Sequence, residues 1–182
     1  MERKNRRLYV LLILLFLAIT TPAAFYVYQF LYPAYVASKT ADAFFGALRE
    51  NDLKAAFQHG SYFDTNSDVR PSISYRAAEE LWVTRVGNLK KQGIYLKSYS
   101  DIKTWTDDAY PVGWVNVTIV EDGRANTYRA PIHFSWLHGK MKIQAIYPSP
   151  YDGALDGFEG AISGNLVPEE GAREGKKPAP TR

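Results

Sequence analysis

The chain has 182 residues, no cysteine and a formal net charge of +3. The lack of cysteine excludes disulfides, thiolate metal sites and a cysteine nucleophile. The positive charge does not indicate nucleic-acid binding, because residues 39–165 carry fourteen Lys and Arg against fifteen Asp and Glu, a net charge of −1.

An uncharged and mainly apolar stretch runs from Leu8 to Ser38, directly after the basic residues 1–7. A helix needs about 20 apolar residues to cross a hydrocarbon core roughly 30 Å thick. We therefore predict a transmembrane helix over residues 8–31. Tyrosines favour the headgroup layer, so the tyrosines late in this stretch are expected at the far interface. The predicted anchor positions are Leu8, Leu11, Leu15, Pro22, Tyr26 and Tyr28.

The basic residues also predict the direction of insertion. Residues 1–7 carry four Lys and Arg against one Glu, and such a basic end stays in the cytoplasm. A cleaved signal peptide is the alternative, with 8–19 as its hydrophobic region and 20–24 as the cleavage region. Apolar residues continue past that region, through 25–32, which favours a retained anchor. Both readings place the following domain outside the cytoplasm, and an exported domain without cysteine is typical of a bacterial cell envelope.

The apolar spacing predicts one domain, over 32–149, in which helices precede strands. Residues recurring every three or four positions predict three helices, at 39–50, from 53 onward and at 72–92. The period then changes to two, which predicts strands at 94–102, 114–120, 127–137 and 141–147. This order indicates an α+β fold with three helices packed on a four-stranded antiparallel sheet. The Gly- and Pro-rich segment 150–182 is predicted to be mostly disordered.

The domain resembles the nuclear transport factor 2-like superfamily, in which a curved sheet wraps a long helix into a cone. The resemblance is carried by the helix pair in 40–57, by helices preceding strands, and by a closing hairpin, 134–143, around a Gly turn. Met141 stands where that family more often has an aromatic residue. The superfamily holds isomerases, small-ligand binders and assembly domains, so the resemblance implies a fold and leaves the function open.

Aromatic residues are the candidate functional residues. Four Trp and nine Phe either fill the cone or line a pocket or docking face at its mouth. A second apolar series, spaced by three or four residues, lies in the Gly-rich segment and is expected to order against a partner or to fold back on the domain. The candidate pocket or docking residues are Trp82, Trp105, Trp114, Trp136, Leu155, Phe158 and Ile162.

No catalytic or metal-binding pattern is present in the sequence. An isomerase-like site needs an acid inside the cone, but most acids fall in predicted turns, and the three histidines are far apart. We therefore predict a non-enzymatic, single-pass membrane protein without a cofactor, acting as an accessory or assembly subunit of an envelope complex. Its partners would be the lipid bilayer and a membrane protein or a second copy, and not nucleic acid. The alternative is a binder of a small apolar ligand or lipid in the cone.

Overall fold

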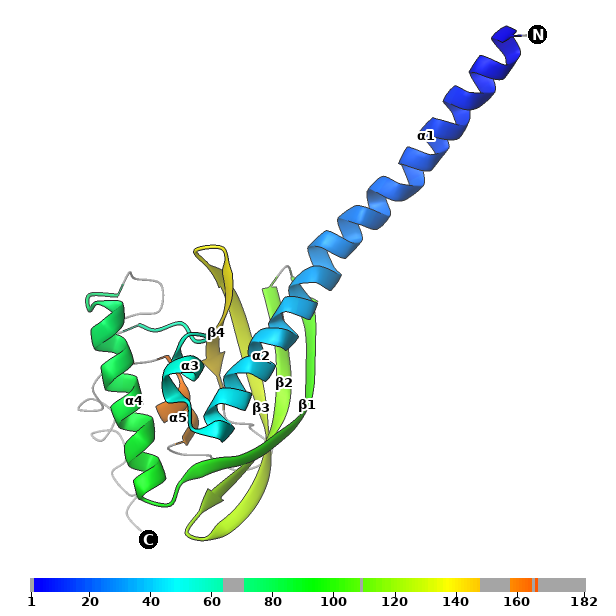
Figure 1. The fold of residues 1–182 in the computed structure, drawn as a ribbon. Coiled ribbons are helices and arrows are strands. Elements are labelled where there is room, and N and C mark those ends of the chain that lie inside the picture. Colours follow the sequence, from blue (N-terminus) through cyan, green and yellow to red (C-terminus); the bar gives the residue numbers. More distant parts are fainter. Residues whose placement is uncertain (1, 64–70, 109, 148–157, 165, 167–182) are drawn as a thin grey trace, which may run out of the picture.

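A computed structural model describes residues 2–63, 71–108, 110–147, 158–164 and 166 (Figure 1). A long N-terminal helix precedes further helices and a four-stranded antiparallel sheet, which confirms the predicted α+β class. The helices are α1 (Glu2–Tyr26), α2 (Tyr32–Glu50), α3 (Leu53–Phe57), α4 (Tyr75–Lys91) and α5 (Phe158–Ile162). The strands are β1 (Tyr95–Asp107), β2 (Tyr110–Glu121), β3 (Arg124–Leu137) and β4 (Lys140–Ile146).

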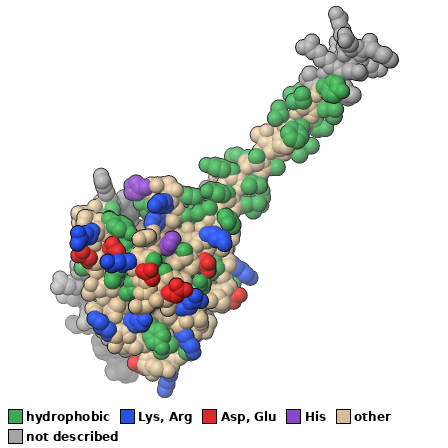
Figure 2. Space-filling view, viewed as in Figure 1, with side chains coloured by type: hydrophobic (Ala, Val, Ile, Leu, Met, Phe, Trp, Pro, Cys, Tyr) green, Lys and Arg blue, Asp and Glu red, His purple; other side chains and the backbone are tan. Residues whose placement is uncertain are grey.

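The helices α1 and α2 form one continuous rod, joined by a π-helical turn at Val27–Leu31. Pro33 lacks an N–H and therefore cannot complete the α-helical hydrogen bond to the residue four positions earlier. The helix is not interrupted at this point but widens into a π-helical turn, in which the Tyr32 N–H donates to the carbonyl of Val27, five residues back. The N-terminal part of this rod is long and apolar enough to cross a membrane. In Figure 2 hydrophobic side chains cover it, whereas charged side chains gather on the domain.

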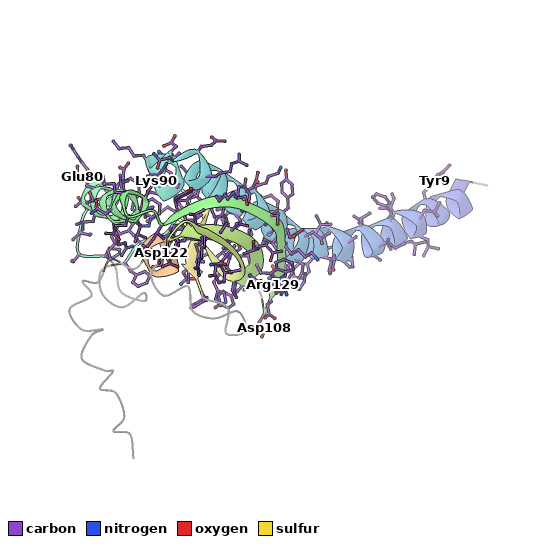
Figure 3. The ribbon with its side chains drawn as sticks, turned by 90° about the horizontal axis from the view of Figure 1, so that it is seen from below. Tyr9, Glu80, Lys90, Asp108, Asp122 and Arg129 are labelled. Atoms are coloured by element: carbon purple, nitrogen blue, oxygen red, sulfur yellow. The ribbon has the colours of Figure 1, made fainter. Side chains whose placement is uncertain are left out.

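The sheet has the order β1-β2-β3-β4 and curves around α2 (Figures 1 and 3). All four strands are longer than or shifted from the predicted ranges, and β1 differs most because it continues to Asp107. Its register with β2 shifts between Leu96 and Ser98 and again between Ser100 and Lys103. Such bulges interrupt the alternation of buried and exposed side chains. Because of this interruption, the period-two pattern predicted a strand that ends at residue 102, whereas β1 continues to Asp107.

The core lies between α2 and the concave face of the sheet. Phe44 and Phe45 of α2 are buried and meet edge to face, with ring centroids 5.1 Å apart. Trp82 of α4 lies against Phe44 on one side and against Phe57 of α3 on the other, at 6.3 and 5.6 Å. The sheet contributes β-branched and aromatic side chains from its inner face, namely Val115, Val117, Ile119, Ile132, Phe134 and Ile143.

The described part of the C-terminal segment folds back on this core. The indole N–H of Trp82 donates to the carbonyl of Ile162 at 3.3 Å, and the Arg85 guanidinium donates to that of Ser163 at 2.9 Å. Gly164 is required here, because a Cβ atom would overlap the carbonyl of Ser61. Residues 158–164 and 166 therefore follow the fold-back alternative for the apolar series within the segment 150–182. Residues 148–157, 165 and 167–182 lie outside the described residues.

We predict that Trp82→Ala destabilises the domain by about 3–5 kcal/mol, since the change removes a fully buried indole and leaves a cavity. Leu81→Ala is the matched control, because its side chain on the same helix is 55% exposed. It should change the free energy of unfolding by less than about 0.5 kcal/mol. Denaturant titration of the full chain in detergent, followed by near-ultraviolet circular dichroism, measures both. Equal effects of the two substitutions would contradict the placement of Trp82.

Candidate functional site

The interior of the cone is occupied by side chains. The cavity bordered by Phe44, Phe57 and Trp82 has a volume of about 10 Å³. Pockets that bind small organic ligands usually measure about 300–1,000 Å³. Trp82 is 1% exposed and lies in the core, in agreement with the alternative that the aromatic residues fill the cone. Surface features must therefore supply any binding site formed by the described residues.

The other candidate residues lie in different surroundings. Trp105 and Trp136 are each 45% exposed and lie on β1 and β3, which β2 separates in the sheet. Trp114 is half-buried on the outer face, with the Arg129 guanidinium 4.3 Å and the Lys103 ammonium 5.1 Å from its ring centre. Phe158 and Ile162 are both buried and α5 packs on the domain, which is the fold-back alternative for this apolar series. Leu155 lies outside the described residues.

The first structured surface feature is the contact between the long helix and β1, which we call the helix–sheet junction. The Thr106 hydroxyl donates to the carbonyl of Phe30 at 2.9 Å, and the Thr104 hydroxyl donates to that of Ala34 at 2.7 Å. The two threonines are two positions apart on β1, so both lie on its inner face, and their hydroxyls reach the helix backbone. Nearby, the ring of Tyr32 stacks on Trp136 of β3, with centroids 6.3 Å apart and planes inclined by 13°.

The junction continues along α2 into the core. The Tyr99 hydroxyl donates to the Asp42 carboxylate at 2.8 Å, and the Tyr99 ring lies 5.9 Å from that of Phe45. Burial, followed by the hydrogen bond to Asp42, raises the pKa of the Tyr99 phenol, so the hydroxyl remains protonated as a donor. Later positions in β1 contact earlier positions in the helix, so the two elements run antiparallel. These hydrogen bonds fix the sheet to the helix between Phe30 and Asp42.

The second feature is a groove beside β4, with a volume of about 1060 Å³. We call it the β4 groove. One wall comes from the outward side chains of β3 and β4 and the turn between them, and the other comes from the residues after α3 and before α4. Its walls include Tyr62, Phe63, Ile73, Tyr75, Ser135, Leu137, Lys140, Lys142 and Gln144. Sequence reasoning missed it because the two walls are about 70 residues apart in the chain.

The β4 groove and the adjoining hollow at His59 are basic as well as aromatic. Lys142 donates through Nζ to the carbonyl of Gln58, and burial, followed by the charge of Lys140, lowers its pKa. Burial, followed by the charge of Lys142, lowers the pKa of His59. Burial, followed by the charge of Glu79, raises the pKa of Tyr75. This combination of cations, phenols and apolar rings suits a partner segment that carries carboxylates beside apolar side chains.

Catalytic and metal chemistry receive no support from the described residues. Among the acids from Asp42 to Asp122 whose side chains the structure describes, none is buried, since Glu79 is half-buried and the others are exposed. Within the described ranges no group of three His, Asp or Glu side chains could hold a metal ion. The predictions that the chain is not an enzyme and needs no cofactor remain predictions.

Comparisons with known proteins add no relative. Scans against protein-family models, curated proteins and solved structures found no match. The architecture is compatible with an α+β cone, and the helix–sheet junction and the β4 groove have to be interpreted from their own geometry.

We predict that Thr106→Val loosens the helix–sheet junction, because valine keeps the shape of threonine and loses the hydroxyl that donates to Phe30. The cost should be about 0.5–1.5 kcal/mol, with faster amide hydrogen exchange in the first turns of α2. Thr118→Val is the control, since its hydroxyl bonds Thr127 on the outer face, 2.9 Å away. Hydrogen-exchange mass spectrometry measures both variants. Unchanged exchange at the start of α2 in Thr106→Val would contradict the junction.

His59 predicts a pH dependence of stability. Its native pKa lies below its ordinary value of 6.5, so the unfolded chain binds this proton at a higher pH than the native chain does. Stability should therefore fall as the pH drops through 6.5 toward the lower native pKa. His59→Gln should reduce this loss, whereas His133→Gln, at an exposed position, should leave it unchanged. Denaturant titrations between about pH 7.5 and 5.5 measure the effect, and identical slopes for all three proteins would contradict it.

Proposed function

We propose that this chain is a single-pass membrane protein of a bacterial envelope, with its N-terminus in the cytoplasm and a nuclear transport factor 2-like domain outside. Its role would be that of a non-enzymatic accessory or assembly subunit that acts by protein–protein contact. The basic residues 1–7 support this orientation, and the wrapped helix with a four-stranded meander is compatible with the family.

The proposal rests on one helix that serves both as the apolar rod and as the core helix of the domain. The rod is apolar and exposed along α1, and the same rod continues as the central core helix α2. A domain joined in this way cannot swing freely on a linker, so it holds its surfaces at a set position relative to a membrane. Fixed presentation favours a structural role. The filled cone also supports it, because the domain has no interior site among its described residues.

The β4 groove is the surface that we assign to the partner. It includes Leu137, next to the β3–β4 turn, and this turn lies at the end of the domain from which the rod leaves (Figure 1). A partner seated there would approach the membrane, which favours another membrane protein or a second copy of this chain. Lys140 and Lys142 would attract carboxylates of the partner.

A second candidate function is the binding of a small apolar ligand or lipid. The volume of the β4 groove, about 1060 Å³, favours this candidate because such a space can hold a lipid-sized molecule. The site would then lie on the flank of the domain and not in the cone.

Photo-crosslinking in native membranes tests the partner. We expect benzoylphenylalanine at Gln144, in the β4 groove, to form a crosslink to one membrane protein or to a second copy. The same amino acid at Ser98, exposed on the outer face of β1, should form none and serves as the control. Mass spectrometry identifies the product. A chain that forms no crosslink from Gln144 and migrates alone after mild detergent extraction would contradict the subunit role, and a small molecule recovered by organic extraction would favour the second candidate.

A further inference from the structure

We propose that the end of the domain nearest the rod lies in the headgroup layer of the same bilayer that the rod crosses. The surface concerned is a set of exposed aromatic side chains, which we call the aromatic rim. It comprises Tyr28 and Tyr32 of the rod with Trp105, Tyr110 and Trp136 of the sheet, each at least 45% exposed. The inference rests on the proposed membrane anchor and adds a lipid contact for the domain itself.

The hydrogen bonds of the helix–sheet junction measure how far the sheet reaches along the rod. Tyr99 contacts Asp42, and Thr106 contacts Phe30, twelve residues nearer the N-terminus. At 1.5 Å per residue this is about 18 Å along the helix axis. The end of β1 therefore lies beside the part of the rod where a membrane segment starting at Leu8 would end.

Helix geometry places this contact in the headgroup layer. About 20 residues cross a hydrocarbon core of roughly 30 Å, so a span that starts at Leu8 leaves the hydrocarbon near Val27. Phe30 is then only about 5 Å further along the axis. The headgroup layer is roughly 5–7 Å thick on each side. The far boundary of the predicted span, residue 31, would thus belong to this layer, together with Thr106 and the turn that follows it.

The side chains at this end are those that the headgroup layer favours. Tyrosine and tryptophan are enriched there because the ring is buried while the polar group stays hydrated. Tyr110 pairs with Asp107 next to the β1–β2 turn and is 70% exposed, and Trp136 reaches the rod from β3 through its stack on Tyr32. The rim therefore combines the rod with three strands, because Trp105 lies on β1, Tyr110 on β2 and Trp136 on β3. Contacts from these four elements would fix the tilt of the domain as well as its distance from the bilayer.

The two ends of the domain differ in character. The β2–β3 turn lies at the end opposite the rod (Figure 1), and its residues Glu121, Asp122 and Arg124 are exposed and charged. The rim end also carries charged residues, namely Asp107 and Asp108 at the β1–β2 turn and Lys140 at the β3–β4 turn, and Figure 3 places Asp108 below the exit of the rod. Charged groups at headgroup depth keep their hydration, so these residues are compatible with the contact. The exposed aromatic side chains of the rim distinguish this end and favour lipid there.

Site-directed spin labelling tests the inference, because the chain contains no cysteine and one introduced cysteine carries the only label. The full chain is reconstituted in phosphatidylcholine vesicles with a label at Tyr110→Cys or at Leu137→Cys, next to Trp136. Asp122→Cys is the matched control at the opposite end, and Leu15→Cys reports the anchor. Relative collision rates with oxygen and with a water-soluble nickel complex give the depth of each label.

We expect the labels at 110 and 137 to read a depth within about 7 Å of the hydrocarbon boundary, and the label at 122 to read bulk water. The label at 15 should lie deep in the hydrocarbon. Bulk-water readings at both 110 and 137, with a deep label at 15, would overturn the lipid contact and leave the anchor intact. A water reading at 15 would overturn the anchor itself.

Discussion

One helix has to satisfy two different surroundings, and the rest of the structure depends on how it does so. Its N-terminal half exposes apolar side chains from Leu11 to Leu31, and its C-terminal half buries Phe44 and Phe45 under a sheet. The change occurs around Phe30 and Ala34, where the hydroxyls of Thr106 and Thr104 bind the helix carbonyls. Because the helix is continuous through this point, the sheet has a defined orientation relative to the apolar rod.

The filling of the cone follows from the same arrangement. A core helix with two adjacent phenylalanines, supported by Trp82 and closed by α5, leaves only about 10 Å³ in the cavity beside them. Large aromatic residues stabilise a small domain through their buried area, and here they occupy the space that a ligand would need. We therefore place the proposed contacts of the described residues on the surface, at the β4 groove and the aromatic rim. The β4 groove is basic and lies on the flank of the domain. The aromatic rim consists of uncharged side chains and lies at the end of the domain nearest the rod.

Local pattern was sufficient to predict the fold class and the order of elements, because apolar spacing in α2 and alternation in β2 report directly on buried faces. It was insufficient where contacts join distant parts of the chain. The spacing of Phe158 and Ile162 left two alternatives, a partner or the domain itself, and only the folded chain shows that the carbonyl of Ile162 accepts a hydrogen bond from Trp82, eighty residues earlier. The β4 groove likewise depends on two walls that only the folded chain brings together. The alternating Thr104 and Thr106 on a strand facing an apolar helix were a usable signal for the helix–sheet junction.

We propose that the domain is held rigidly on the apolar rod, and the distance between the two tests this rigidity. Spin labels at Leu15→Cys and Glu80→Cys, in the full chain reconstituted in lipid nanodiscs, report this distance by double electron–electron resonance. A pair within the domain, Glu80→Cys and Asp122→Cys, gives the width expected for a rigid body. We expect the distribution of helix-to-domain distances to be a single peak, about as wide as that of the pair within the domain. A broad distribution for the helix-to-domain pair beside a narrow one within the domain would contradict it.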